Sequence, residues 1–279
     1  MTGGPRAALP MYARSETAAA EARYWSAIRA AAGDRGLPET LGSPDDLMAH
    51  WRDPDLAFSQ TCGLPYRTSL YGTVRLIGTP DHGLPGCLPG HYNSVLVMRR
   101  AAATEDPAAW VGLRLARNSR GSQSGWAAAQ SHVAPLGLAF DALAAIDTGS
   151  HRGSVRAVAE GAADIACIDA RSWAMIREWD AEARALREVA RTAPTPGLPY
   201  ITGPAGDPAA LAAAVRGALE ALEPDDRACL RITGLVEIPA EAYLAVPTPD
   251  LAPDPALDPA PGAAPGPGHV REGAPAHRD

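Results

Sequence analysis

A serine-rich turn carries the strongest chemical signal in the sequence. Residues 113–129 read LRLARNSRGSQSGWAAA, in which a predicted strand ends, a Gly/Ser turn follows and a helix begins. The first N–H groups of a helix lack internal partners and carry the positive end of its dipole. Ser122, Gln123, Ser124 and Gly125 could therefore surround an oxyanion with backbone and side-chain donors. The alternative is that Ser122 or Ser124 only caps its own helix.

A second turn of the same kind lies at residues 146–169, IDTGSHRGSVRAVAEGAADIACID. His151 falls at the start of a predicted helix, and Asp169 ends the apolar strand that follows it. Helix starts and carboxyl strand ends are the places where α/β sheets present groups to ligands. The alternatives are a packing or capping role for His151 and an N-cap role for Asp169, ahead of a helix beginning at Arg171.

Two tyrosines of the first hundred residues complete the candidate set. Tyr66 closes the loop SQTCGLPY after a predicted strand, and Tyr12 ends the first predicted strand. Each offers a hydroxyl to an anion or a ring to a pocket wall, although a surface aromatic explains each equally well. The sequence has no GxSxG, HExxH or Walker motif, so no catalytic residue is predicted and the chain is not expected to be an enzyme.

The cysteines indicate neither a metal site nor a cofactor. Cys62, Cys87, Cys167 and Cys229 include no CxxC pair and no histidine at zinc-finger spacing. Cys62 and Cys87 both lie in Gly/Pro-rich loops that could meet, so a disulfide between them is left open. Such a bond would require an oxidising compartment. Cys167 lies in the apolar run IACI and is predicted to be a core residue.

Composition excludes several classes of protein. The chain has 279 residues and a net charge of -7, and all 25 of its Lys+Arg residues are arginine. Lysine chemistry is therefore excluded, and an acidic chain is not expected to bind nucleic acid. No stretch approaches the ~20 apolar residues of a membrane span, so membrane insertion is not expected. The first residues lack the apolar core of a signal peptide, which predicts a soluble, unexported protein for the sequence as written.

Alternating predicted strands and helices indicate an α/β fold with two lobes. The first lobe is predicted over residues 1–97 and 195–247, and the second over residues 98–194. The two chain crossings, predicted near residues 96–99 and 191–195, would form a hinge. Residues 248–279 are rich in Pro, Ala, Gly and Asp without periodicity, which predicts a disordered tail.

Together these segments resemble the phosphate/phosphite/phosphonate-binding proteins of ABC transporters, the phosphonate-binding branch of the type II periplasmic binding proteins. The resemblance covers roughly residues 7–245 and rests on five segments in the family's order: SQTCGLPY, HYNSVLVMRR, SRGSQSG, TGSHRGSVRAVAEGAADIACID and TAPTPGLPYIT. It implies two lobes joined by two crossover strands that close on a ligand in the cleft between them.

The same resemblance implies ligand contacts at Ser122, Gln123, Ser124, His151, Asp169, Tyr66 and Tyr12, to which the helix start adds Gly125. Gln123 departs from the small hydroxyl residue frequent in the family, which affects the identity of the ligand more than its class. The implied function is capture of phosphate, phosphite or a phosphonate by a monomer that serves an ABC permease. The family implies a periplasmic or extracytoplasmic location, whereas the absent signal peptide implies a cytoplasmic one.

Two other functions remain open from the sequence. One is a cytoplasmic enzyme on the same fold, of the menaquinone-pathway type, acting on a carboxylate substrate in the cleft. The other is a cytosolic sensor that reports ligand occupancy to a partner protein. The missing export signal favours the enzyme, while the lack of a convincing general base apart from His151 and Asp169 weighs against it.

Overall fold

The computed structural model describes residues 6–33 and 35–249, which form two five-stranded sheets and one two-stranded sheet. The first sheet has the order β1-β2-β11-β3-β12. Its strands are β1 (Arg6–Ala8), β2 (Leu56–Gln60), β3 (Arg75–Asp81), β11 (Tyr200–Thr202) and β12 (Gly234–Val236). The helices beside this sheet are α1 (Ala18–Ala32), α2 (Leu47–Trp51), α3 (Gly63–Pro65), α7 (Pro208–Ala221), α8 (Pro224–Leu230) and α9 (Ala240–Leu244). We call this part the first lobe.

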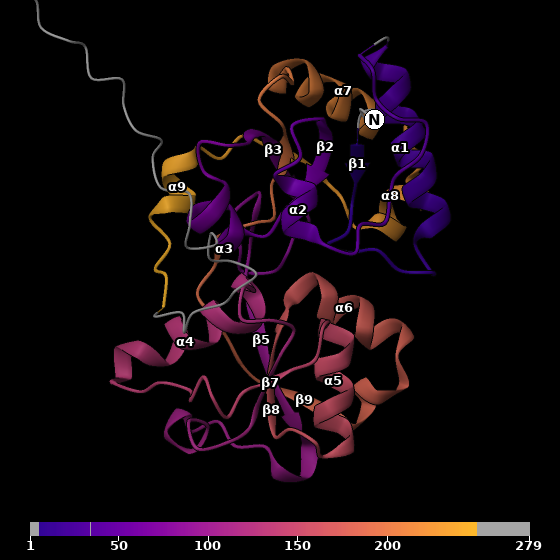
Figure 1. Ribbon diagram of the computed structural model, residues 1–279. Coiled ribbons are helices and arrows are strands. Elements are labelled where there is room, and N and C mark those ends of the chain that lie inside the picture. Colours follow the sequence, from indigo (N-terminus) through magenta and orange to yellow (C-terminus); the bar gives the residue numbers. More distant parts are fainter. Residues whose placement is uncertain (1–5, 34, 250–279) are drawn as a thin grey trace, which may run out of the picture.

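The core of the first lobe lies between its sheet and the helices α1 and α7, which lie together in Figure 1. Tyr24 and Ile28 recur at helical spacing on the buried face of α1, and Val215 comes from the facing side of α7. They pack against Phe58 of β2 and Tyr200 of β11, whose ring centroids are 5.0 Å apart. A second apolar cluster lies around α2 and α9.

The second sheet has the order β7-β6-β8-β5-β9 and forms the core of the second lobe. In β8, Ala166 and Ile168 join one apolar cluster while Ile165 and Cys167 join the other, as the two-residue period of a strand requires. Its strands are β5 (Ser94–Arg99), β6 (Leu115–Arg117), β7 (Ile146–Asp147), β8 (Ile165–Asp169) and β9 (Leu186–Arg191). Its α-helices are α4 (Ala128–Val133), α5 (His151–Glu160) and α6 (Ala170–Trp179). Cys167 is fully buried, as predicted for a core residue.

The chain passes between the lobes at a short two-stranded sheet. β4 (His91–Tyr92) pairs antiparallel with β10 (Thr195–Pro196), so the outgoing and returning segments lie side by side. The outgoing crossing therefore precedes residues 96–99, where it was predicted, because all of β5 belongs to the second sheet. Residues 94–97, predicted for the first lobe, accordingly pair with strands of the second. The predicted tail lies almost entirely outside the described residues.

The strand predicted to end at the serine-rich turn is short in the structure. Only Leu115–Arg117 form β6, because Pro107 opens a 3-10 turn and the buried indole of Trp110 donates to the carbonyl of Thr104 at 3.0 Å. The helix predicted after residue 122 is present, but its first turn, Gln123–Ala127, is π-helical before α4 continues it. Its opening residues are therefore wound more widely than in an α-helix.

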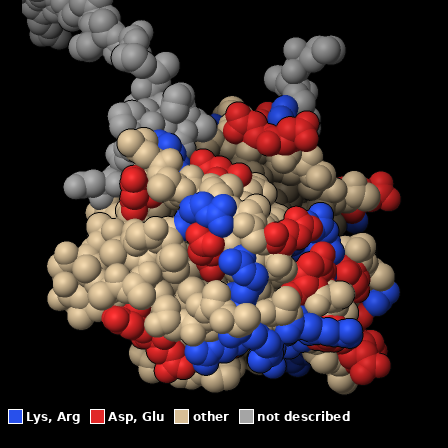
Figure 2. Space-filling model, turned by 90° about the horizontal axis from the view of Figure 1, so that it is seen from below, with Lys and Arg blue, Asp and Glu red and all other residues tan. Residues whose placement is uncertain are grey.

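Charges of both signs are mixed on the surface of the second lobe. Figure 2 views this end of the molecule, where basic and acidic side chains lie next to one another. Ion pairs such as Arg114–Asp164 at 2.9 Å and Arg187–Glu105 at 3.1 Å join them. Among residues 6–33 and 35–249, no helix is both long and apolar enough to cross a bilayer.

Candidate functional site

A cavity of about 490 Å³ lies between the lobes. The second lobe contributes mostly polar side chains and glycines from the turn after β6, the start of α5 and the start of α6. The first lobe contributes mostly apolar side chains from the loop after β1 and from α2. The lining residues of the second lobe are Asn118, Ser119, Gly121, Ser122, Ser124, Gly149, Ser150, His151, Arg152, Asp169, Ser172, Met175 and Ile176; those of the first are Pro10, Met11, Tyr12, Ala13, Arg14, Leu47, Met48, Trp51, Cys62, Pro65 and Leu198.

The structure brings the predicted hydroxyls and imidazole together at this cavity. Ser122 is the N-cap of the π-helical turn, where its Oγ accepts from the Gly125 N–H at 2.9 Å. The Oγ of Ser124 lies 3.5 Å from that of Ser122 and 2.9 Å from Nε2 of His151. Ser122 and Ser124 are both only 4% exposed. Ser122 therefore both caps the helical turn and lines the cavity.

Burial keeps His151 neutral. Its pKa is lowered from the ordinary value to about 4, because the charged imidazolium would lose its hydration. Nε2 accepts from the backbone N–H of Asp169 at 3.4 Å, and Nδ1 is buried without a hydrogen-bond partner in the part of the chain that the structure describes. At neutral pH the ring therefore faces the cavity as a neutral hydrogen-bonding group.

The lowered pKa of His151 makes stability depend on pH. Below its ordinary pKa of about 6.5 the unfolded chain binds a proton that the folded protein does not accept until about pH 4. The free energy of unfolding should therefore fall as the pH falls through this window, by about 2–3 kcal/mol from this residue. Denaturant unfolding of wild type and His151→Asn at pH 7.5 and 4.5 measures it: the variant should lose less stability. An equal loss in both proteins would contradict the assignment.

Asp169 lies at the cavity in a buried hydrogen-bonded group. Oδ1 of Asp169 accepts from the N–H of Ser172, and by this hydrogen bond Asp169 caps α6. Oδ2 of Asp169 accepts from the Tyr12 hydroxyl at 2.9 Å. Burial raises the pKa of Asp169 and contributes most to the higher pKa of Tyr12. The guanidinium of Arg171 lies 3.8 Å from the centre of the Tyr12 ring and donates to the carbonyl of Leu230 at 2.7 Å. Asp169 therefore caps α6, and it also accepts a hydrogen bond from Tyr12 across the cleft.

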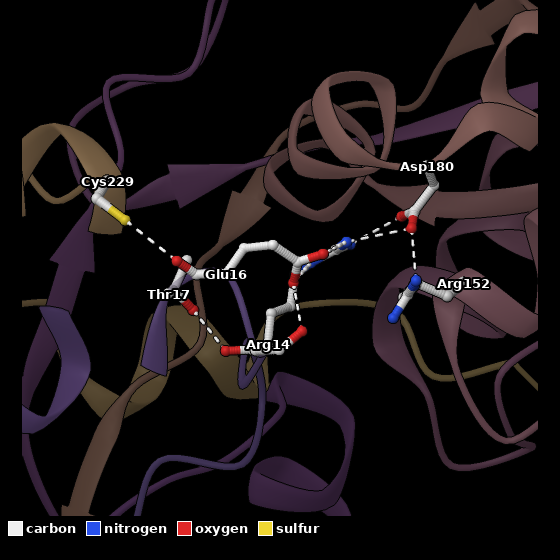
Figure 3. Close-up of polar contacts among 7 residues, drawn as sticks. Arg14, Glu16, Thr17, Arg152, Asp180 and Cys229 are labelled. Carbon is white, nitrogen blue, oxygen red and sulfur yellow. Dashed lines mark hydrogen bonds and ion pairs between the residues drawn. The ribbon is translucent and has the colours of Figure 1, made fainter. Parts of the chain in front are cut away.

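Charged side chains at the cavity edge bind one another across the lobes (Figure 3). Arg14 of the first lobe reaches Asp180, which follows α6, with an Nη1–Oδ2 distance of 2.9 Å, and Arg152 reaches the same carboxylate at 2.6 Å. Arg14 also pairs with Glu16 at 3.1 Å and lies over the ring of Trp179. Both guanidinium groups that line the cavity are thus already paired with carboxylates. We call Arg14, Asp180 and Arg152 the interlobe ion cluster.

Three of the predicted site residues do not line the cavity. The segment after β2 continues through α3 into a π-helical turn, Tyr66–Leu70, which turns the Tyr66 ring into the first-lobe core against Tyr243, 5.2 Å away. The Gln123 side chain instead accepts from Arg67 of the first lobe at 2.6 Å. Gly125 packs behind the turn, against Asn118. The structure does not bring these three positions to the cavity lining, and ligand contacts at them stay predictions.

The disulfide left open by the sequence is not formed. All four cysteines, each within the described part of the chain, are free. Cys62 is buried at the cavity, where its Sγ accepts from the backbone N–H of Gln123 at 3.3 Å, and Cys87 lies in the loop before β4. Each thiol has its pKa raised mainly by burial, so neither has the low pKa of a reactive cysteine.

Gly125 is required for space. A Cβ at this position would lie 2.0 Å from Oδ1 of Asn118, whose side chain lines the cavity. We expect Gly125→Ala to push Asn118 aside and to cost about 1–3 kcal/mol of stability. Thermal unfolding measures this cost, with Gly112→Ala as the control, because a Cβ at Gly112 would meet no atom within 4 Å. Equal melting temperatures for the two variants would contradict this account.

Several cavity residues were not predicted from the sequence. Asn118 and Ser119 precede the serine turn directly and could have been found by extending it. Arg14 lies two residues beyond Tyr12, and Arg152 lies directly after His151. Helix α2, which brings Leu47, Met48 and Trp51 to the cavity, carries no chemical signal of its own, because apolar residues at this spacing indicate core packing.

Comparisons with known proteins agree with this architecture. PhnD1 of Prochlorococcus marinus, solved with methylphosphonate, superimposes with a TM-score of 0.67 at 13% identity, over 86% of this chain and 94% of that one. A binding-protein component of an ABC phosphonate transporter from Pseudomonas aeruginosa gives 0.60 at 13% identity, over 84% and 82%. A Xanthomonas citri protein solved with ATP gives 0.60 at 17% identity, over 88% and 98%. No curated protein sequence matches the chain.

The structural neighbours include type II periplasmic binding proteins, which confirms the predicted fold class. The model of the family described as "ABC transporter, phosphonate, periplasmic substrate-binding protein" matches residues 55–243, a range that holds both crossings, the serine turn, His151 and Asp169. This family consists of substrate-binding proteins and not of enzymes. The chain therefore belongs to the phosphonate-binding family of ABC-transporter substrate-binding proteins.

Proposed function

We propose that the interlobe cavity binds a small phosphoryl oxyanion, either phosphate, phosphite or a phosphonate, and that the protein delivers it to an ABC permease. The observation that carries this proposal is the convergence of Ser122, Ser124 and His151 on one side of the cavity. The family membership supports the permease as the partner.

Neutral donors suit such an anion. The arginines of the interlobe ion cluster are occupied by Asp180, so the anion is held by hydroxyl and N–H groups rather than by a free cation. When the Ser124 hydroxyl turns to donate to the anion, Nε2 of His151 keeps the backbone N–H of Asp169 as its donor, at 3.4 Å. Hydrogen bonds from buried neutral groups to a charged ligand contribute about 1.5–3 kcal/mol each.

Asp169 supplies selectivity among oxyanions. A buried carboxylate repels a dianion, so it favours a ligand that presents a proton, either on a phosphoryl oxygen or on an amine. Sulfate carries no such proton at neutral pH. Asp169 therefore discriminates against sulfate if the ligand is hydrogen phosphate, and favours the amine if the ligand is an aminoalkyl phosphonate.

Titration of wild type and Asp169→Asn with phosphate, sulfate, methylphosphonate and 2-aminoethylphosphonate tests the proposal. Asparagine keeps the shape of the side chain, and it retains an oxygen that can accept the capping hydrogen bond from the N–H of Ser172. We expect phosphoryl ligands to bind wild type in preference to sulfate. In the variant the discrimination against sulfate, or the advantage of the amine-bearing ligand over methylphosphonate, should fall by about tenfold or more.

The contradictory outcomes are distinct. If wild type binds none of the phosphoryl ligands, the proposed function is wrong. If both proteins rank the ligands identically while the variant is less stable, Asp169 serves only as the cap of α6 and as the partner of Tyr12.

A further inference from the structure

The first-lobe lining of the cavity is mostly apolar. It includes Met11, Leu47, Met48, Trp51 and Pro65, which we call the apolar wall. The indole N–H of Trp51 donates to the carbonyl of Gln60 at 3.2 Å. It is therefore already satisfied within the first lobe, and the wall offers carbon and sulfur surface to a ligand.

The cavity is large for an inorganic anion. Its volume of about 490 Å³ lies within the range of ~300–1,000 Å³ that is typical for sites of drug-sized ligands. A tetrahedral oxyanion has only five heavy atoms. A water molecule, which has one heavy atom, occupies about 30 Å³ in the liquid, so the oxyanion needs much less space than the cavity offers. An oxyanion at the serines would therefore leave most of the cavity, including the apolar wall, to water.

Lobe closure does not account for this spare volume, because side chains of the two lobes are already in contact across the cleft. Hydrogen bonds and ion pairs cross the cleft at Tyr12–Asp169 (2.9 Å), Arg14–Asp180 (2.9 Å), Arg67–Gln123 (2.6 Å), Arg171–Leu230 (2.7 Å) and Arg231–Glu178. Further closure would have to break or compress these contacts. The cavity is thus the space that remains when the lobes are together.

We propose that the ligand is an organic phosphoryl compound whose apolar alkyl or aryl group packs on the apolar wall while its phosphoryl group meets the serines. This inference rests on the proposed function for the phosphoryl end and adds the chemistry of the other end. Wetting a wall of methionine, leucine and tryptophan is unfavourable, and an apolar substituent displaces that water. A phosphonate and a phosphate monoester share this chemistry.

The test is calorimetric titration of the full chain with methylphosphonate, butylphosphonate, phenylphosphonate and phenyl phosphate. We expect affinity to rise along the phosphonate series, with phenylphosphonate at least about tenfold tighter than methylphosphonate. Comparison of phenylphosphonate with phenyl phosphate identifies which of the two sources the site prefers.

Two substitutions by polar residues of similar size test whether the apolar wall causes the preference for phenylphosphonate. Met11→Gln and Leu47→Asn change partly buried side chains of the wall and keep their approximate volume. Combined, they should bring the phenyl-to-methyl affinity ratio close to one. Leu143→Asn is the matched control, because Leu143 is 83% exposed and does not line the cavity, and it should leave the ratio unchanged.

The wild-type series decides the inference even if the variants fold poorly. If methylphosphonate binds as tightly as phenylphosphonate or more tightly, the apolar subsite is refuted while the proposed function stands. If no phosphoryl compound binds, the proposed function fails and the subsite fails with it. A phenyl preference that survives in the double variant would also refute the assignment to this wall.

Discussion

Replacing Ser122 and Ser124 together by alanine is expected to weaken phosphoryl-ligand binding by at least about 100-fold. Each hydroxyl is buried at the cavity and, in our account, donates to a charged oxygen. Loss of each hydrogen bond to a charged group costs about 1.5–3 kcal/mol, and 1.4 kcal/mol corresponds to a factor of ten. Calorimetric titration of wild type and the double variant with methylphosphonate measures the change.

This variant also removes a helix cap, because the Ser122 Oγ accepts from the Gly125 N–H. Asp207→Ala is the control for that effect, since Asp207 caps α7 far from the cavity by accepting from the N–H of Ala210. It should cost a similar ~1 kcal/mol of stability without weakening binding. Equal affinities for wild type and the double serine variant would show that the anion binds elsewhere.

Asp180→Ala is expected to open the lobes and to destabilise the protein by about 3 kcal/mol. The substitution leaves Arg14, whose side chain is only 5% exposed, facing Arg152 without the carboxylate that both arginines share. Glu16 retains part of the pairing with Arg14. The resulting repulsion acts across the cleft, so the ligand-free variant should show a larger radius of gyration in small-angle scattering than wild type.

Glu105→Ala provides the comparison for this experiment. Its partner is Arg187, and both residues belong to the second lobe, with Glu105 largely exposed. Loss of such an exposed pair costs about 0–1 kcal/mol and should not alter the scattering profile. If Asp180→Ala gives the same radius of gyration as wild type, the interlobe ion cluster does not hold the lobes together.

The sequence predicts those parts of the site that depend on local chemistry. Serines at a turn between a strand and a helix, and an aspartate at the end of an apolar strand, lie where their neighbours in the chain place them. Ser122, Ser124, His151 and Asp169 accordingly line the cavity, although they come from three separate segments. Because the fold class follows from alternating strands and helices, it could be predicted in the same way.

The parts that could not be predicted depend on contacts between distant segments. Tyr66 lies in a loop of the right composition, but a π-helical turn and packing on Tyr243 draw its ring into the core. The partners Arg14 and Asp180 are 166 residues apart in the chain. Nothing in the local sequence of either one indicates the other, because arginines and aspartates are common on solvated surfaces.

A crystal structure with methylphosphonate tests the central claim most directly. Our account predicts the phosphoryl group in the interlobe cavity, with its oxygens within hydrogen-bonding distance of the Oγ atoms of Ser122 and Ser124 and its methyl group directed toward the apolar wall. A ligand bound at any other place, or a phosphoryl group contacting the first lobe alone while Ser122 and Ser124 retain only their present partners, would contradict it.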